Sequence, residues 1–321
     1  MVKRKTIRRT NRPAATDGTA PTPKVAAAKR TATAEAASLT EPEKSSSESP
    51  PDPNYPRYRI DPGSDVKLGD VDADESEHYT GKRDVAEELD RQRKRIRDLQ
   101  ERLYAERQRS LLIVLQAMDT GGKDGTIRGV FQGVNPQGCQ VWSFKAPSTE
   151  EMEHDFLWRY HLKAPSRGLI TIFNRSHYEE VLIVRVKKLM PEDVWRRRYA
   201  MINEFEQMLA LNNTTIIKFY LHISKDEQKR RLQSRLDDDS KHWKFSSADL
   251  KERAYWDDYM TAFEDAVENC STEVAPWYVI PANKKWYRNL VIARTIADTL
   301  EAMDPQFPDA EKGLARLTID D

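Results

Sequence analysis

The stretch LLIVLQAMDTGGKDGTIR, residues 111–128, constrains the fold more than any other part of the chain. Residues 111–115 form an unbroken apolar run, which predicts a strand buried on both faces of a parallel sheet. A glycine-rich turn follows, and a helical pattern begins at residues 124–131. A strand, a glycine turn and a helix in this order form a cradle in which backbone N–H groups converge on an anion. The stretch therefore predicts a phosphate-binding loop.

The residues of this loop fit the role, with two departures from the common P-loop (Walker A) pattern G-x-x-x-x-G-K-[ST]. Gly122 and Lys123 match that pattern, whereas Ala117 replaces its first glycine and Asp124 replaces its Ser or Thr. We expect phosphate contacts from the loop amides, the lysine ammonium and the first turns of the helix. These positions are Thr120, Gly121, Gly122, Lys123, Asp124, Gly125 and Arg128.

Asp119 is the most informative residue in the loop. A carboxylate directed at phosphates repels them unless a cation lies between them or the site needs a base. Asp119 is therefore a candidate ligand of Mg²⁺, or of Mn²⁺, and a candidate base. The alternative is that it is a turn residue whose side chain hydrogen-bonds its own backbone.

Three long motifs carry a family resemblance. They are AMDTGGKDGTIRGVFQGVNPQG at 117–138, FNRSHYEEVL at 173–182 and APWYVIPANKKWYRNLVIAR at 275–294. From about residue 57 to residue 303 the chain resembles the polyphosphate kinase 2 family. This resemblance implies transfer of phosphoryl groups between inorganic polyphosphate and nucleotides. The second motif and the single-domain length resemble class III, which acts on both AMP and ADP, rather than members with FDRSWYNR.

Composition limits the other possibilities. The 321 residues are 32% charged and have a formal net charge of zero, so any anion site must be a local concentration of Lys and Arg. Cys139 and Cys270 show no metal-binding or redox spacing, which favours reduced residues of an intracellular, cytoplasmic protein. The longest apolar runs are too short to span a bilayer, so we expect a soluble protein.

The chain divides into four parts. Residues 1–56 consist mainly of Ala, Thr, Pro, Ser and charged residues, which predicts a disordered tail, basic at its start. This tail is either simply solvated or a polyanion- or nucleic-acid-binding arm, a nuclear signal or a transit peptide. Residues 57–110 are expected to form an extension with an amphipathic helix packed on the core. Residues 111–303 form the phosphotransferase domain, and 304–321 a C-terminal tail.

The order of the elements predicts the fold class. Further strands are expected at 139–145, 169–173, 215–223 and 277–280, with helices after Ser148 and at about 177–188 and 192–211. Alternation of strands and helices predicts a five-stranded parallel sheet with helices on both faces, a three-layer P-loop kinase-like sandwich. Ligands then gather at the carboxyl ends of the strands, where Asp119, Asn174, Ser224 and Asn283 lie.

The polar cluster after the third strand adds candidates. P-loop enzymes usually place an acidic metal-holding residue at this position, but Asn174 stands here, so the metal depends on Asp119. Some family members carry Asp at the matching place. Arg175 follows and suits phosphate, the alternative being an ion pair with a structural carboxylate such as Glu180. We assign Asn174, His177, Tyr178 and Glu180 to the nucleotide side of the site, and Asp119, Lys123 and Arg175 to catalysis.

A basic helix leads into a polar stretch after the fourth strand. The stretch DDDSKHWKFSSAD at 237–249 shows no apolar pattern and predicts a mobile loop. Nucleotide kinases place their lid here, so we expect a lid over about residues 225–260. Its phosphate-binding candidates are Arg231, Arg235, Lys241 and Lys244, although a run of charges also suits a solvated face.

Together these observations predict Mg²⁺-dependent phosphoryl transfer from polyphosphate to AMP and ADP, without a covalent intermediate. The expected partners are polyphosphate, adenine nucleotides and further copies of the chain in a homo-oligomer, with no membrane or nucleic-acid partner. One alternative is an ATP-dependent nucleotide kinase. Another is a polyphosphate- or nucleic-acid-binding protein that catalyses no reaction.

Overall fold

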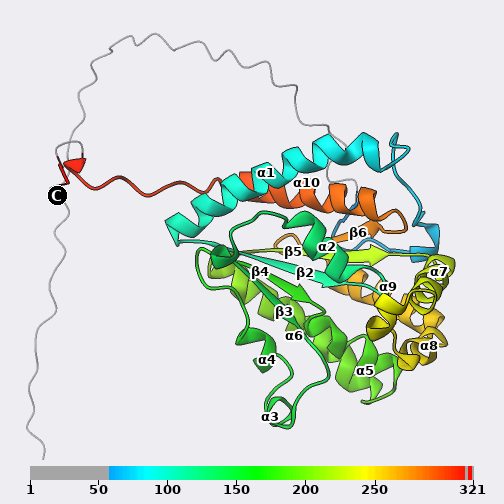
Figure 1. The fold of residues 1–321 in the computed structure, drawn as a ribbon. Coiled ribbons are helices and arrows are strands. Elements are labelled where there is room, and N and C mark those ends of the chain that lie inside the picture. Colours follow the sequence, from blue (N-terminus) through cyan, green and yellow to red (C-terminus); the bar gives the residue numbers. More distant parts are fainter. Residues whose placement is uncertain (1–57, 315–316, 320–321) are drawn as a thin grey trace, which may run out of the picture. The chain divides into compact units, whose positions relative to one another are not determined.

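A six-stranded sheet forms the centre of the computed structural model, which describes residues 58–314 and 317–319. Its spatial order is β1-β6-β5-β2-β4-β3 (Figure 1). The strands are β1 (Arg59–Ile60), β2 (Ser110–Gln116), β3 (Cys139–Ser143), β4 (Ile170–Asn174), β5 (Thr214–His222) and β6 (Trp277–Pro281).

Strands β2 to β6 pair in parallel, which confirms the predicted five-stranded parallel sheet. The central strand β2 is buried along its whole length, as its apolar sequence predicts for a strand covered on both faces. The sheet also has an antiparallel edge strand that the sequence did not reveal, because β1 pairs Arg59 with Tyr278. A strand of two residues is too short to leave a periodic signal.

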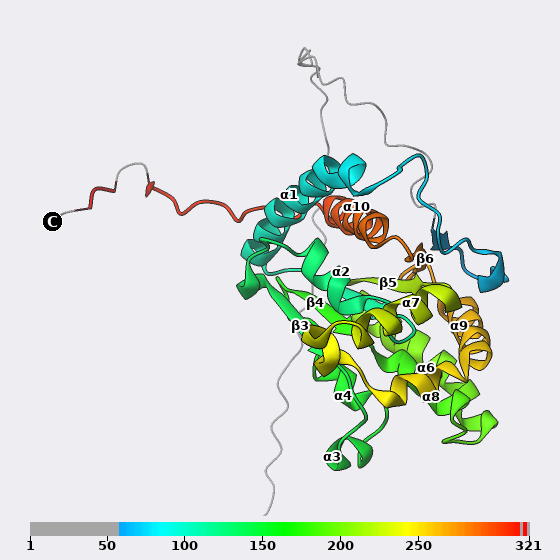
Figure 2. The ribbon, with the colours of Figure 1, turned by 45° about the vertical axis from the view of Figure 1, so that its right-hand side comes forward.

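Helices cover both faces of the sheet, which confirms the three-layer arrangement (Figures 1 and 2). One face carries α1 (Lys82–Glu106), α2 (Lys123–Val130) and α10 (Lys285–Met303). The other carries α5 (Ile183–Val186), α6 (Glu192–Leu211) and α9 (Trp256–Cys270). Helix α1 lies along α10 and buries Leu89, Ile96 and Leu103, so its apolar spacing predicted its packing face correctly.

Two predicted helices are shorter than expected. The Ser148–Glu151 capping box is present, but it opens only α3 (Thr149–Met152), and α4 (Trp158–His161) follows after a break. The helix expected over 177–188 is likewise divided into the 3₁₀ helix η3 (His177–Glu180) and α5. Two further 3₁₀ helices are η1 (Leu68–Asp70) and η2 (Pro136–Gly138).

The stretch expected to be a mobile loop contains regular structure. After α7 (Lys225–Leu236) come η4 (Asp239–Lys244) and α8 (Ser247–Arg253). The Asp238 side chain accepts a hydrogen bond from the Ser240 amide at 3.1 Å, and the Ser246 side chain accepts one from Ala248 at 3.2 Å. The Asp- and Ser-rich composition that suggested a loop thus provides the N-caps of two short helices.

The predicted tail, residues 1–56, lies outside the described residues. In the part of the chain that the structure describes, no helix is both long enough and apolar enough to cross a membrane. Cys139 and Cys270 are free cysteines, as predicted.

Candidate active site

The loop between β2 and α2 has a backbone that needs its glycines. Thr120 has φ of 63° and Gly122 has φ of 107°, a left-handed conformation that glycine adopts without strain. A Cβ atom on Gly121 would overlap the Ala117 side chain, and one on Gly122 would overlap the Arg288 guanidinium. Glycine at 121 and 122 therefore allows the tight turn and the close approach of Arg288.

Two buried arginines donate hydrogen bonds to backbone carbonyl oxygens of this loop. The Arg231 Nη1 atom donates to the carbonyl oxygens of Thr120 and Gly121, each at 3.0 Å, and Arg288 Nη1 donates to Gly121 at 3.4 Å. Burial, reinforced by the charge of Arg231, lowers the pKa of Arg288 to about 9. Because a trans peptide directs its C=O and N–H in opposite directions, the Gly122 N–H points away from these guanidinium groups. The arginines thus orient the loop so that the Gly122 N–H is directed toward the side where an anion would bind.

Lys123 is the first residue of α2. Its Nζ atom donates to the carbonyl oxygen of Ala117 at 3.0 Å. Burial lowers the pKa of Lys123 to about 8, and the nearby Arg175 acts in the same direction. An ammonium group held in this way is stabilised by a bound anion, so a phosphate on this loop would restore its pKa.

Asp119 and Arg175 meet across the sheet edge. Arg175, just after β4, has φ of 64°, and its Nη2 atom donates to Asp119 Oδ1 at 2.7 Å. The Asp119 backbone carbonyl accepts from Gln228 Nε2 at 3.1 Å. Gln228 Oε1 in turn accepts from Arg253 at 2.9 Å, so α7 and α8 support the position of Asp119.

A small pocket adjoins this ion pair. It is lined by Met118, Asp119, Arg175, Glu179, Leu182, Glu252, Tyr259 and Phe263. Arg175 lies 3.7 Å from the Glu179 carboxylate, which also accepts from Gln116 Nε2 at 3.2 Å. The lining combines the apolar side chains of Met118, Leu182 and Phe263 with charged ones, a mixture that suits a polar ligand with a flat apolar part.

Asn174 links the end of β4 to the start of α2. Its Nδ2 atom donates to Asp124 Oδ1 at 2.6 Å, and the residue is only 9% exposed. The neutral amide thus gives the Asp124 carboxylate a donor. An Asp at 174 would place two carboxylates in contact instead.

The known proteins most informative for this geometry are polyphosphate kinases. The family model "Polyphosphate kinase 2 (PPK2)" matches residues 79–308. The chain belongs to the polyphosphate kinase 2 family. A relative from Meiothermus ruber, named AMP/ADP-polyphosphate phosphotransferase, is 51% identical over 82% of this chain and 99% of its own length. The ADP-polyphosphate phosphotransferase of Rhodopseudomonas palustris is 46% identical over 79% of this chain and 92% of its own length.

Solved structures agree with this assignment. The crystal structure of polyphosphate kinase 2 from Arthrobacter aurescens TC1 matches with a TM-score of 0.78 at 48% identity, over 81% of this chain and 93% of that one. A structure titled putative polyphosphate kinase 2 from Pseudomonas aeruginosa PA01 matches with a TM-score of 0.69 at 34% identity, over 73% of this chain and 50% of that one. The second comparison covers only half of the other chain.

Two residues that we assigned to the nucleotide side of this polyphosphate kinase fold are buried instead. His177 and Tyr178 are 0% exposed, and both hydrogen-bond Glu206 Oε1, at 3.1 and 3.0 Å. Lys218 Nζ donates to the other Glu206 oxygen at 2.5 Å. Because these groups face the core and not the pocket, direct nucleotide contact is not retained for His177 or Tyr178.

Glu180 also has a partner other than the expected one. It pairs with Arg198 at 2.5 Å, whereas Arg175 pairs with Asp119 and Glu179. Burial raises the pKa of Glu180, which the charge of Arg198 opposes. The pair joins α6 to the segment after β4 and lies beside the pocket rather than in it.

The predicted lid cations fall into two groups. Arg231 is 8% exposed, and its donors contact Glu227 and four backbone carbonyls, so it supports the loop and is not an open phosphate ligand. The others are more accessible: Arg235 pairs with Asp249 at 3.4 Å, Lys241 pairs with Asp238 at 2.7 Å, and Lys244 lies over the Trp243 ring. Burial and the charge of Asp119 raise the pKa of Asp249.

Sequence reasoning missed Arg288, Gln228, Glu179, Glu252 and Tyr259 as site residues. Glu179 was interpreted as a charge that favours a helix N-terminus, and Arg288 lies within a motif whose helix looked structural. Nothing in the local sequence distinguishes them, because their contacts come from segments far away in the chain. Arg128 is exposed at the end of α2.

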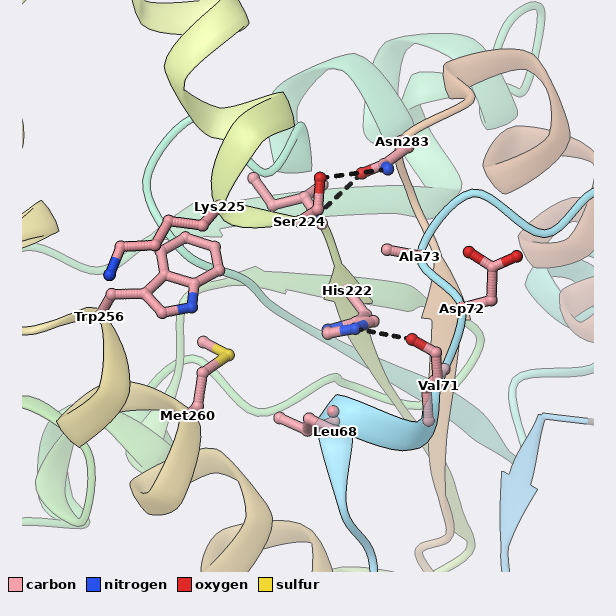
Figure 3. A pocket seen from close by; sticks show the side chains of 12 residues that line it. Leu68, Val71, Asp72, Ala73, His222, Ser224, Lys225, Trp256, Met260 and Asn283 are labelled. Carbon is pink, nitrogen blue, oxygen red and sulfur yellow. Dashed lines mark hydrogen bonds between the residues drawn. The ribbon is translucent and has the colours of Figure 1, made fainter.

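A larger pocket of about 360 Å³ lies at the ends of β5 and β6, away from Asp119 (Figure 3). Trp256 and Met260 of α9 form one side, and the segment after η1 forms the other. His222 Nε2 donates to the Val71 carbonyl oxygen at 3.1 Å. Lys225 is the cation in its lining, so the pocket offers much less positive charge than the loop.

Proposed function

We propose that this chain transfers phosphoryl groups between inorganic polyphosphate and adenine nucleotides, with both AMP and ADP as acceptors. The observation that carries the proposal is the phosphate loop held by two arginines, with Lys123 beside it and the Asp119–Arg175 pair at the same sheet edge. The activity named for the relative that is 51% identical supports both acceptors. The reaction is reversible in principle, because it exchanges one phosphoanhydride for another.

In this mechanism the protein positions charges and forms no covalent bond. The loop amides and Lys123 hold the donor phosphates, and Arg175 lies where a guanidinium can neutralise the equatorial oxygens of the transferring group. Arg235, Lys241 and Lys244 are carried by the lid and approach on closure, which also excludes water.

The donor set at the loop fits a magnesium ion. Mg²⁺ in phosphotransferases is held by one or two carboxylates together with substrate phosphates. Among the described residues no group of three or more His, Cys, Asp and Glu side chains could hold a metal by itself, and Asp119 is the carboxylate on the loop. Asp119 would therefore hold Mg²⁺, or Mn²⁺, and the ion would supply charge neutralisation between donor and acceptor. Asp119 pairs with Arg175 in this structure, so Asp119 engaged with the ion would leave Arg175 available to contact phosphate.

The acceptor is proposed to bind at the small pocket beside Arg175, whose cavity of about 30 Å³ would have to open to admit a nucleotide. Its phosphates would lie near Arg175, which Asn174 directly precedes in the chain, and its base would lie against Leu182 and Phe263 of the pocket lining. Glu179 and Glu252 border the same space and can accept hydrogen bonds from a ribose or an amino group.

One assay tests the proposal against its two alternatives. Purified protein is incubated with Mg²⁺, long-chain polyphosphate and AMP, ADP or GDP in turn, and the nucleotide products are separated. We expect AMP to give ADP and ADP to give ATP. Turnover with ATP and a nucleoside monophosphate, without any use of polyphosphate, would instead identify an ATP-dependent kinase. Polyphosphate binding without turnover on any nucleotide would identify a binding protein.

A further inference from the structure

The pocket of about 360 Å³ at the ends of β5 and β6 has no role in the phosphoryl transfer described above. We call it the β5–β6 pocket. Among the described residues it shares no lining residue with the small pocket beside Arg175. Helix α9 contributes to both: Trp256 and Met260 line the β5–β6 pocket, whereas Tyr259 and Phe263 line the small one. The two pockets are therefore separate spaces, and the β5–β6 pocket is large enough for a small organic molecule.

The walls of the β5–β6 pocket are largely apolar and include one aromatic side chain. Trp256 is only 7% exposed although its side chain lines the cavity. Met260 lies beside it on α9, and Leu68 and Ala73 come from the segment around η1 (Figure 3). An indole ring and a thioether both make favourable contacts with aromatic rings. The walls thus suit a ligand with a planar ring.

His222 adds a hydrogen-bond acceptor to this wall. Its Nε2 atom donates to the Val71 carbonyl oxygen, so the ring carries its hydrogen on Nε2. Burial lowers the pKa of His222, which keeps the ring neutral at pH 7. The other nitrogen, Nδ1, is then an acceptor; it is buried and has no hydrogen-bond partner among the described residues. An unpaired buried acceptor favours a ligand that donates a hydrogen bond.

The polar groups of the lining indicate a ligand without net charge. Lys225 lies 3.9 Å from the Asp257 carboxylate, and the Asp72 carboxylate belongs to the lining, so the one cation is offset by acids. The Ser224 hydroxyl oxygen accepts from Asn283 Nδ2 at 3.3 Å and from the Glu227 amide at 3.1 Å (Figure 3). Its own hydrogen is therefore available to an acceptor on a ligand.

We propose that the β5–β6 pocket binds an uncharged planar nitrogen heterocycle that carries an N–H donor, of the size of a nucleobase or a nucleoside. The ring lies against Trp256, its N–H group donates to His222 Nδ1, and a ring nitrogen accepts from the Ser224 hydroxyl. A phosphate on the same ligand is disfavoured, because the Asp72 carboxylate would repel it. This ligand differs in charge and in place from the nucleotide acceptor, so the proposal does not depend on the phosphotransferase assignment.

A comparison of two ligands on the full wild-type chain tests the hydrogen bond to His222. Adenosine and purine riboside, which lacks only the amino group of the base, are titrated by calorimetry without metal or polyphosphate. We expect adenosine to bind about tenfold more tightly, the value of one hydrogen bond. His222→Phe keeps a flat ring without the acceptor and should bind the two ligands with equal affinity. Circular dichroism confirms that this variant is folded, and equal affinities in the wild type would by themselves overturn the proposal.

A glycine in the lining allows the binding place to be tested. Gly69 lines the β5–β6 pocket, and a Cβ atom added there would meet nothing within 4 Å. Gly69→Phe therefore adds a ring at the pocket without backbone strain and should weaken adenosine binding at least about tenfold. Gly81→Phe is the matched control, because Gly81 has the same open surroundings and lies at the start of α1, outside both pockets. This control should bind adenosine as the wild type does.

Two results of the same titrations would contradict the assignment. Adenosine affinity unchanged in Gly69→Phe would place the nucleoside elsewhere, for example in the acceptor pocket. A wild type that binds adenosine no more tightly than about 1 mM would show that the β5–β6 pocket is not a site for this class of ligand.

Discussion

Lys123 is the site residue whose charge depends most on pH near neutrality. Its pKa is lowered to about 8, so the free enzyme loses this ammonium above that pH. We expect kcat/KM for polyphosphate to fall above about pH 8, whereas kcat at saturating donor should fall only at higher pH, because bound phosphate stabilises the charge. The measurement is a pair of pH profiles with ADP as acceptor.

Lys123→Ala should remove both the activity and its alkaline dependence. Loss of one charge-assisted contact in the transition state is worth several kcal/mol, so we expect less than about a tenth of the activity to remain. Lys145→Ala, at an exposed lysine after β3, is the control and should behave as the wild type. A Lys123→Ala variant that keeps more than about a tenth of the wild-type activity would contradict the phosphate-loop assignment.

Asp119 should matter far more than Asn174 for metal use. Asp119→Asn removes the carboxylate from the loop, whereas Asn174→Ala removes a neutral amide bound to Asp124. The difference in kcat/KM between these two variants should narrow as the concentration of free Mg²⁺ or Mn²⁺ is raised, because mass action offsets weaker metal binding. Activity is measured at a series of free metal concentrations. Equal losses at the two positions, unaffected by metal, would be incompatible with Asp119 as the ligand.

Acceptor choice should respond to charge at position 174. Asn174→Asp adds a carboxylate near the acceptor, and we expect kcat/KM to fall more for ADP than for AMP, because ADP carries more charge. The contact with Asp124 complicates this variant, since two carboxylates would then meet. Asn174→Asp/Asp124→Asn restores an amide–carboxylate contact at the wild-type net charge, so it tests a carboxylate at position 174 without contact between two carboxylates. If both acceptors lose activity equally in the double variant, the electrostatic reason is wrong.

The part of the site that local sequence could predict is the part built from one segment. Asp119 and Lys123 lie in the loop itself, and Arg175 lies directly after a recognisable strand. Arg231 looked like a lid cation because a helical charge pattern does not reveal which side faces a loop 110 residues away. His177 and Tyr178 looked polar, but their partner Glu206 is 29 and 28 residues further on.

At the scale of elements, largely apolar runs predicted β2, β4, β5 and β6, because strands buried on both faces need such sequence. The fifth predicted parallel strand, β3, lies at the sheet edge and is partly exposed. Segments of two to seven residues were harder to predict. The edge strand β1, the break between α3 and α4, and the helices η4 and α8 of the predicted lid depend on caps and tertiary pairing rather than on periodicity. Short helices are stable only with such support.

The buried charges between α6 and β5 predict a large stability effect. Lys218 donates to Glu206, Tyr178 and the Cys270 carbonyl, and both charged residues are 0% exposed. Although burial raises the pKa of Glu206, the charge of Lys218 and the His177 hydrogen bond outweigh it and leave that pKa below its ordinary value. Lys218→Met should therefore destabilise the protein by about 3–5 kcal/mol, because it leaves a carboxylate buried without its partner.

Urea denaturation of the Lys218→Met variant provides the measurement. The double variant Glu206→Gln/Lys218→Met is the matched control and should recover part of the loss, since it leaves no uncompensated buried charge. Equal stability of the single variant and the wild type would show that the pair contributes nothing net.

At the scale of the whole molecule, the sheet order brings the functional groups together. Strands β2 and β4 are neighbours, so the loop with Asp119 meets Arg175, and β5 and β6 on the other side direct α7 and α10 behind the loop. Arg231 and Arg288 reach the same carbonyl from these two helices. The position of the candidate catalytic groups at one edge thus depends on four neighbouring strands of the sheet.

The N-terminal residues provide the last prediction. Residues 1–54 consist largely of Ala, Thr, Pro, Ser and charged residues, so they cannot bury enough apolar surface to add to the core. Their deletion ends before Tyr58 and β1, which pairs with β6. We expect kcat and KM for both nucleotides to stay within about twofold of the wild type, with an unchanged melting temperature. The basic start of the segment allows one different result, namely a polyphosphate KM that rises on deletion at low salt but not at high salt. That result would contradict an inert tail and make the basic arm part of the donor site.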